Sequence, residues 1–303
     1  MTVIPAKQIL IRTPQPNWWF STDFNVNLYR GCTHGCIYCD SRSVCYGDPD
    51  FDTIKVKENA LEILTLQMRK KRVKGVIMTG AMSDPYNPLE KKLQLTKGLL
   101  ELCDFYRYGI AITTKSDLVI RDLELLTSIS KHSPVLVMFS LSTVDESLSS
   151  WIEPKAPSPA RRLLAMQKLQ EAGIFTGVLL MPVLPFLEDK PQQIRDLVAL
   201  CGQHGAKFIY PWFGVTMREG NREYFLKKLK RRDPEMAKRY QHRFGNSYFC
   251  SISRPDQMME LFKSECARYG ILNQMQQIVK AYKKPKESPK SKQLDIFDYS
   301  LDG

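Results

Sequence analysis

The sequence predicts an α/β fold: a partial (β/α)6 TIM-like barrel followed by a C-terminal helical extension and a disordered basic tail. Two observations predict the barrel. Short apolar runs rich in β-branched residues recur along the chain, and segments with a helical spacing of apolar residues lie between them. This alternation is typical of βαβ units that build a parallel sheet. Polar residues follow nearly every apolar run, as expected where barrel strands end at a site.

The predicted strands lie, in chain order, at residues 24–29, 73–79, 109–113, 135–141, 174–181 and 208–212. The helices between them are predicted at residues 54–71, 89–105, 118–130, 160–172 and 194–204. Helix signals agree, because Ser158 and Pro159 form a typical helix start and Gly173 and Gly205 stand where helices are expected to end. Six such units fit a partial barrel better than a flat open sheet, although the pattern alone allows both.

After about residue 215 the pattern changes to basic helical stretches at 221–241, 255–269 and 271–282. Residues 283–292 are rich in lysine and punctuated by proline, which predicts a disordered linker. We therefore expect three parts: a barrel over 1–215 that carries a cysteine loop at 32–39, a basic helical extension over 216–282, and a flexible tail over 283–303.

Hydropathy and charge narrow the class of protein. No uninterrupted apolar stretch reaches the eighteen residues of a candidate membrane helix, and the first residues lack the layout of a secretory signal. A cytoplasmic location without a membrane anchor is therefore expected. The net charge of +12 is concentrated in runs at 69–72 and 227–232 and in the tail. Such runs together favour a polyanionic partner, most simply nucleic acid.

Eight cysteines in a reducing compartment favour metal binding or catalysis over disulfides. Five of them are scattered and are expected to be buried free thiols: Cys45, Cys103, Cys201, Cys250 and Cys266. The other three, Cys32, Cys36 and Cys39, form a C-x3-C-x2-C spacing on one predicted loop. Zinc prefers four ligands in separated pairs, so a zinc site would need His34 or Cys45 as well. Three thiolates suit a [4Fe–4S] cluster with one iron left without a protein ligand.

At these residues the chain resembles the radical S-adenosylmethionine superfamily. The spacing of Cys32, Cys36 and Cys39 is the signature of that superfamily, and Tyr38 occupies its aromatic position before the third cysteine. The resemblance implies that the open iron chelates S-adenosylmethionine and that a 5′-deoxyadenosyl radical abstracts hydrogen from a substrate. It also implies an electron donor such as flavodoxin or ferredoxin, and a Tyr38 ring that covers the cofactor.

Further stretches resemble the spore photoproduct lyase-like branch of the superfamily, at residues 27–39, 79–90, 113–116, 151–162 and 214–225. This likeness extends over roughly residues 17–225 and implies that Ser83, Lys115 and Ser140 bind S-adenosylmethionine. Lys115 would supply a cation for the carboxylate of the cofactor, and Asp84 would take the ribose hydroxyls. For Glu153 and Arg162 a structural ion pair is the alternative to a functional role.

One position departs from the pattern of that branch. In spore photoproduct lyase a cysteine before the serine–aspartate pair donates a hydrogen atom to the product radical, whereas this chain has Met82 there. A thioether has no S–H to donate, so the lyase reaction does not transfer directly. Tyr38, Tyr86 and Cys250 are the candidate replacements, and Tyr38 and Tyr86 are the catalytic residues predicted from the sequence.

The tail ends in an apolar pentapeptide, Gln293, Leu294, Asp295, Ile296 and Phe297. It resembles the motif that binds the bacterial sliding clamp, in which the glutamine anchors backbone groups and the apolar side chains fill pockets. The lysine- and proline-rich tether before it would give the peptide reach and a high local concentration. An apolar end that packs on its own domain is the alternative.

Together these features predict a radical S-adenosylmethionine enzyme that acts on damaged DNA. Cys32, Cys36 and Cys39 would hold the cluster. Ser83, Asp84, Lys115 and Ser140 would hold the cofactor. Two alternatives stay open: a radical enzyme that modifies RNA, protein or a small molecule, and a non-catalytic zinc protein that binds nucleic acid.

Overall fold

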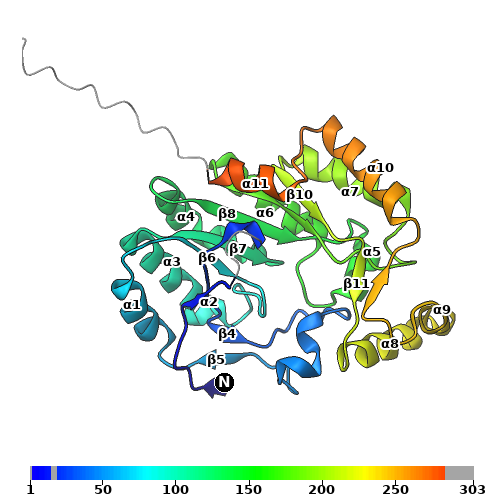
Figure 1. Cartoon of the computed structure of the whole chain (residues 1–303), viewed down its shortest axis with the longest axis horizontal. Coiled ribbons are helices and arrows are strands. Elements are labelled where there is room, and N and C mark those ends of the chain that lie inside the picture. Colours follow the sequence, from blue (N-terminus) through cyan, green and yellow to red (C-terminus); the bar gives the residue numbers. More distant parts are fainter. Residues whose placement is uncertain (1, 15–18, 284–303) are drawn as a thin grey trace, which may run out of the picture.

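The computed structural model describes residues 2–14 and 19–283 (Figure 1). Its main sheet has the strand order β10-β9-β8-β7-β6-β3-β2. Six of these strands are parallel neighbours: β3 (Phe24–Asn25), β6 (Val76–Thr79), β7 (Gly109–Thr114), β8 (Val135–Ser140), β9 (Phe175–Leu180) and β10 (Phe208–Pro211). The short edge strand β2 (Ile11–Arg12) runs antiparallel to β3. The predicted partial (β/α)6 barrel is confirmed.

Helices follow the parallel strands, and most of them cover the outer face of the sheet, whereas the helix at residues 146–152 packs with the cysteine loop (Figure 1). They are α1 (Ala60–Lys70), α2 (Glu90–Leu93), α3 (Leu95–Tyr106), α4 (Leu123–Ser130), α5 (Glu146–Ile152), α6 (Pro159–Glu171) and α7 (Pro191–Gln203). The predicted start of α6 is confirmed, because the Ser158 side chain accepts a hydrogen bond from the Arg161 N–H.

Several predicted elements differ from the structure. The helix predicted at 118–130 is a 3-10 helix at Asp117–Asp122 followed by α4, and the helix predicted at 271–282 begins only at Met275. The run at 24–29 is divided, because β4 (Tyr29–Arg30) leaves the main sheet to pair with β5 (Lys55–Lys57), which also pairs with β1 (Thr2–Ile4). The predicted helix at 54–71 therefore begins only at α1. The helix predicted at 89–105 is two helices, since Gln94 has a φ of +52°.

The helix predicted at 221–241 is also two helices, α8 (Asn221–Arg232) and α9 (Pro234–Phe244). Pro234 lacks an N–H and cannot continue α8, and the Asp233 side chain instead caps α9 by accepting from the Met236 N–H at 2.9 Å. Two further helices follow, α10 (Pro255–Arg268) and α11 (Met275–Tyr282).

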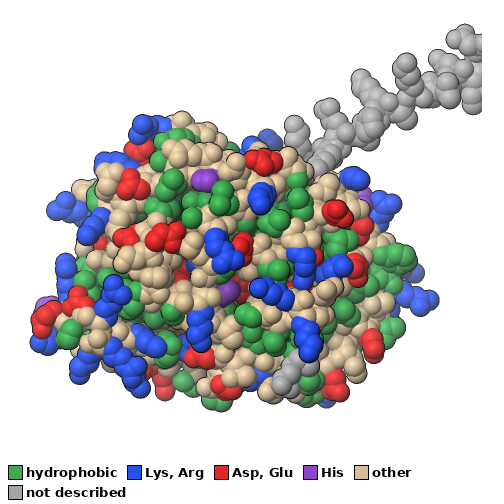
Figure 2. All heavy atoms as spheres, turned by 180° about the vertical axis from the view of Figure 1, so that it is seen from behind, with side chains coloured by type: hydrophobic (Ala, Val, Ile, Leu, Met, Phe, Trp, Pro, Cys, Tyr) green, Lys and Arg blue, Asp and Glu red, His purple; other side chains and the backbone are tan. Residues whose placement is uncertain are grey.

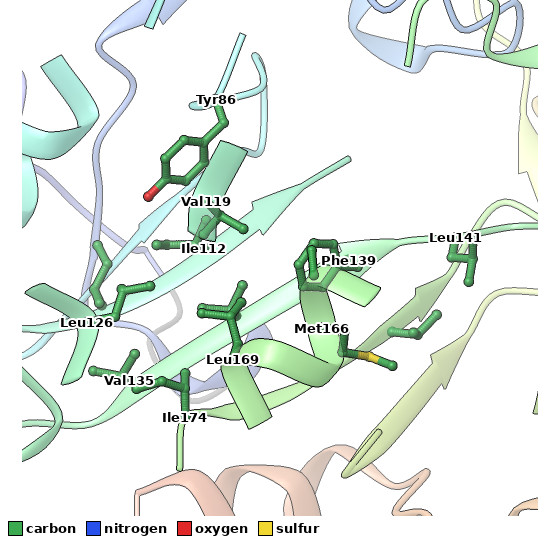
Figure 3. Close-up of a cluster of buried hydrophobic side chains, with 14 of the residues drawn as sticks. Tyr86, Ile112, Val119, Leu126, Val135, Phe139, Leu141, Met166, Leu169 and Ile174 are labelled. Atoms are coloured by element: carbon green, nitrogen blue, oxygen red, sulfur yellow. The ribbon is translucent and has the colours of Figure 1, made fainter. Parts of the chain in front are cut away.

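The sheet separates two hydrophobic layers. Side chains such as Ile112 and Phe139 point to the outer layer under the helices, where Figure 3 shows them with Leu126 and Met166. Their neighbours along the strands point the other way, as the two-residue period of a strand requires, and line the inner layer: Met78, Ala111, Met138 and Leu179. Helix α11 packs on this inner layer through Ile278 and Tyr282, and the Tyr282 hydroxyl donates to the Phe20 carbonyl at 2.5 Å.

Helices α8 and α9 form a projecting pair between β11 (Gly214–Thr216) and β12 (Phe249–Ser251), which pair antiparallel. We call residues 218–243 the basic hairpin. It carries ten Lys and Arg residues against four Asp and Glu residues, a net charge of +6 and half of the +12 of the whole chain. Figure 2 shows Lys and Arg side chains gathered where the hairpin projects, at the lower left.

All eight cysteines are free thiols, as expected for a chain without disulfides. Cys103, Cys201, Cys250 and Cys266 are buried as predicted, but the prediction was wrong for Cys45, which is exposed. No helix in residues 2–14 and 19–283 is long and apolar enough to cross a membrane. The predicted clamp-binding residues, 293–297, lie outside the described residues.

Candidate functional site

The cysteine loop follows β4 and is tied to the protein by its backbone. The Cys32 N–H donates to the Phe51 carbonyl at 2.9 Å, and the Ile37 N–H donates to the Ile152 carbonyl at 2.9 Å. At the start of the loop Gly31 has a φ of +81°, and a Cβ there would lie 2.3 Å from the Thr53 carbonyl oxygen. Only glycine fits this turn, so the local sequence fixes the direction in which the loop leaves β4.

The three loop cysteines face a cavity of about 320 Å³ at the carboxyl ends of the parallel strands. Every metal- or cofactor-binding residue predicted from the sequence lines this cavity: Cys32, Cys36, Cys39, Ser83, Asp84, Lys115 and Ser140. Sequence reasoning did not include Trp19, Phe51 and Met181, which also line it. They come from segments without a motif, so no local signal marked them.

Asp84 is a buried hub in the wall of this cavity. Its oxygens accept hydrogen bonds from Thr114 Oγ1 at 2.7 Å, from the Lys115 N–H at 2.8 Å, and from His34 Nε2 and the Tyr86 N–H at 2.9 Å each. Because a carboxylate only accepts, the His34 tautomer carries its hydrogen on Nε2. Burial opposes ionisation, but His34 and the other donors outweigh it and lower the pKa of Asp84 to about 2.

These four donors occupy the acceptor capacity of Asp84. The predicted contact with ribose hydroxyls therefore finds no free acceptor site, and Asp84 instead joins the cysteine loop, through His34, to the end of β7. Ser83 acts similarly, since its Oγ donates to the Gly31 carbonyl at 2.5 Å. Both residues position the loop against the strand ends.

Lys115 presents a largely buried ammonium group to the cavity. Its Nζ lies 3.6 Å from Glu153 Oε1 and 5.8 Å from the centre of the Tyr38 ring. Burial disfavours the charged form, but the Glu153 carboxylate and Cys36 outweigh it and the pKa of Lys115 is raised. A fixed cation of this kind suits the carboxylate of an amino-acid ligand.

Glu153 connects the loop, the strand ends and α6. Its side chain is buried, lies 2.5 Å from the Arg162 guanidinium and accepts from the Tyr38 hydroxyl. Arg162 in turn donates to the Ser140 carbonyl at 3.0 Å. The ion pair between Glu153 and Arg162 is confirmed, and it reaches two of the predicted site residues, Lys115 and Ser140.

The candidate hydrogen-atom donors lie elsewhere. The cavity lining does not include Tyr38, Tyr86 or Cys250, all of which the structure describes, whereas it does include Met82. The Tyr38 hydroxyl donates to Glu153, and the Tyr38 ring is not part of the lining of the cavity that it was expected to cover. Tyr86 is 1% exposed within the outer hydrophobic layer (Figure 3), and Cys250 is buried beside the basic hairpin.

The donor set fits an iron–sulfur cluster better than zinc. Among residues 2–14 and 19–283, no three His, Cys, Asp or Glu side chains are placed to hold one metal ion. Zinc draws its ligands to one ion, whereas the thiolates of a [4Fe–4S] cluster bind separate irons. His34 is hydrogen-bonded to Asp84, and Cys45 contacts Arg218 in a different depression, so neither joins the three cysteines as a zinc ligand.

Comparison with known proteins gives the family. The family model of the radical SAM superfamily matches residues 26–198, more than half of the chain. An uncharacterized protein of Mycobacterium tuberculosis strain H37Rv is 30% identical over 255 residues, which cover 82% of this chain and 75% of that protein. An uncharacterized protein of Methanocaldococcus jannaschii is 35% identical over 168 residues, which cover 54% of this chain and 61% of its own length.

Among solved structures, spore photoproduct lyase complexed with dinucleoside spore photoproduct has a TM-score of 0.62 at 15% identity, over 89% of this chain and 80% of that one. A variant of the same enzyme with bound S-adenosylmethionine gives a TM-score of 0.59. At this identity the likeness shows a shared fold. The chain therefore belongs to the radical S-adenosylmethionine superfamily, whose members bind a [4Fe–4S] cluster and S-adenosylmethionine.

Proposed function

We propose that this radical S-adenosylmethionine enzyme acts on DNA, as a repair enzyme that abstracts hydrogen from a damaged nucleotide. The observation that carries the proposal is the basic hairpin, which packs directly behind the cysteine loop. Phe225, Leu229 and Tyr240 of the hairpin share one hydrophobic cluster with Cys36 and Tyr38. A surface suited to a polyanion is thus built on the same support as the radical site.

Within this proposal Cys32, Cys36 and Cys39 would hold the cluster, and Lys115 and Ser140 would bind S-adenosylmethionine. When bound, cluster and cofactor supply a 5′-deoxyadenosyl radical. The protein contributes a largely buried cation at Lys115 Nζ, held by Glu153, and an apolar wall that includes Met78 and Leu179. The wall keeps water away from a reactive species.

Spore photoproduct lyase has been solved in complex with dinucleoside spore photoproduct. The shared fold and the basic hairpin support a DNA substrate here. Met82 limits the analogy, because it lines the cavity without an S–H group. The proposal is therefore hydrogen abstraction from DNA, with the return of hydrogen assigned to another group. An external electron donor and the clamp-binding tail stay predictions.

The chemical step is tested by anaerobic reconstitution of the full chain. We expect a brown protein that forms 5′-deoxyadenosine under strong reductant. The variant Cys36→Ala should lose the iron–sulfur absorbance. The control Cys103→Ala changes a buried cysteine that does not line the cavity and should retain the absorbance. With deuterium-labelled, ultraviolet-irradiated DNA, label should appear in 5′-deoxyadenosine. Label transfer from RNA, protein or a small molecule in place of DNA would contradict the DNA assignment.

The DNA contact is tested by duplex binding at several salt concentrations. The variant Lys227→Gln/Lys230→Gln/Arg231→Gln removes three exposed charges of the hairpin, and Lys168→Gln/Lys207→Gln/Lys263→Gln removes three exposed charges elsewhere. The slope of log K against log salt should become shallower by about 0.9 for each lost phosphate contact in the hairpin variant only. Equal slopes in both variants would refute the hairpin as the DNA surface.

A further inference from the structure

A second cavity lies beside the cofactor cavity. It measures about 460 Å³ and is bounded by the loops that follow β6, β7 and β8. Its charged lining residues are Lys91, Arg121, Lys155, Arg161 and Asp117. His34 lines this cavity and the cofactor cavity alike, so the two hollows meet at the cysteine loop.

The charges of this second cavity are unbalanced. Arg161 is paired with Asp117 at 2.6 Å, and Arg121 is paired with the buried carboxylates of Glu90 and Asp122 at 2.8 and 2.7 Å. Lys91 and Lys155 form no ion pair with any residue that the structure describes. Two ammonium groups at one hollow are thus left for an anion from outside the chain.

His34 provides a second, independent sign of a ligand. Its side chain is 5% exposed, and although Nε2 is held by Asp84, the buried Nδ1 has no hydrogen-bond partner. Buried polar atoms in proteins are nearly always satisfied. Because Nε2 carries the hydrogen, Nδ1 is an acceptor, so it points to a bound group that brings a hydrogen-bond donor, such as a sugar hydroxyl or base amino group next to a phosphate. The Lys155 N–H holds the His34 carbonyl at 3.0 Å, so one of the two free lysines is anchored to this residue.

We propose that the second cavity binds a phosphate group of the substrate strand, next to the nucleotide that reacts in the cofactor cavity. This inference rests on the proposed function. Lys91 and Lys155 would neutralise the phosphate, with the Arg161 guanidinium within the same lining. A hollow of nucleotide size favours a compact phosphate over the convex acidic surface of a redox protein. Binding at His34 would be felt at Asp84 and hence at the strand ends that hold the cofactor.

The test compares Lys91→Gln/Lys155→Gln with Lys168→Gln/Lys263→Gln, which removes the same charge from exposed positions on α6 and α10. Full-length enzyme with its cluster is titrated with a labelled single-stranded oligonucleotide by fluorescence anisotropy at several salt concentrations. One lost phosphate contact should weaken binding by about fivefold at 0.1 M salt and make the slope shallower by about 0.7 in the cavity variant. The control variant should stay close to wild type, and circular dichroism checks the folding of both.

Calorimetry with thymidine 5′-monophosphate and inorganic pyrophosphate separates the sources of the phosphate. Loss of oligonucleotide binding in the cavity variant supports the strand phosphate. If the cavity variant loses only mononucleotide binding, the cavity is an anion site whose ligand is a free nucleotide. This result can be obtained even if the wild type does not bind DNA and the proposed function is wrong. If the cavity and control variants match in every titration, the phosphate cavity is refuted while DNA binding by the wild type stands. A defect confined to reduction by flavodoxin would overturn the proposal in favour of an acidic protein.

Discussion

Replacing Glu153 with glutamine tests whether a buried charge network holds the site together. The carboxylate of Glu153 is 3% exposed and faces two cations, Arg162 at 2.5 Å and Lys115 at 3.6 Å. Glu153→Gln keeps the size of the side chain and removes the negative charge. Arg162 then remains buried without a counter-ion, and Lys115, whose side chain is 14% exposed, loses the carboxylate that faces it.

The expected cost follows from this burial. Arg162 is 1% exposed and cannot reach water without unpacking α6. Breaking a buried ion pair by removing one partner costs about 3–5 kcal/mol, because the remaining charge is uncompensated. An isolated surface change costs about 0.5 kcal/mol or less. Glu101→Gln, at an exposed position on α3, is the matched control.

The assay is anaerobic urea denaturation of the cluster-free protein, followed by circular dichroism, with the free energy of unfolding taken from midpoint and slope. A companion double variant, Glu153→Gln/Arg162→Met, removes one stranded cation together with the carboxylate. We expect it to be more stable than Glu153→Gln, with a coupling of about 0.5–3 kcal/mol.

A cofactor measurement adds a result that mere destabilisation would not give. Since Glu153 raises the pKa of Lys115, its loss should weaken binding of S-adenosylmethionine to the reconstituted enzyme. As the pH rises, that binding should also be lost at a lower pH than in the wild type, because Lys115 gives up its charge earlier. If Glu153→Gln is as stable as Glu101→Gln, or if adding Arg162→Met to it brings no recovery, the charge-network reasoning is refuted.

Three further predictions concern single residues. Burial raises the pKa of Glu188 to about 8, so the folded state keeps a proton that the unfolded state loses above about pH 4, and stability should fall by up to about 1.4 kcal/mol per pH unit until about pH 8. Glu188→Gln should abolish that fall in urea titrations across the range, and an unchanged slope would contradict it. The pKa of Asp84 is lowered to about 2, so ionised Asp84 contributes about 2–3 kcal/mol to the free energy of unfolding above about pH 4. This contribution is lost as the pH falls toward 2. Asp84→Asn should remove this acid dependence when unfolding of the cluster-free protein is measured. Gly80→Ala would place a Cβ 2.0 Å from the Thr113 carbonyl oxygen and should lower the thermal midpoint clearly more than Gly173→Ala, where φ is also positive but nothing lies within 4 Å; equal midpoints would show that the strand ends can move apart.

The sequence predicted most of the barrel, because buried parallel strands are continuous apolar runs that need no partner to be visible. It missed β5, a Lys-Val-Lys strand whose pairing with β4 depends on a long-range contact. It also missed α5, a short serine-rich helix that starts where the Asp145 side chain accepts from the Leu148 N–H at 3.0 Å. Elements as short as β5 and α5 show no repeated apolar pattern, so their sequences cannot be told from those of loops.

The cysteine loop was predictable for a similar reason: its ligands lie within eight residues. The contacts behind it were not, since Tyr38 and Glu153 are 115 positions apart and His34 and Asp84 are 50 apart. The aromatic ring of Tyr38 was expected over the cofactor, but its hydroxyl needed a buried acceptor, and Glu153 lies on the far side of the loop.

The hydrophobic cluster shared by the cysteine loop and the basic hairpin has a thermodynamic consequence. If binding at one of the two sites changes the packing of this cluster, the two sites are linked, and the linkage acts equally in both directions. A polyanion that steadies Phe225 and Leu229 would also steady Cys36, and thereby favour retention of the cluster. Under the proposed function, oxidative loss of the cluster would in turn loosen the hairpin and weaken its hold on DNA. An enzyme that carries a dangerous radical source would then stay on its partner only while it is able to react.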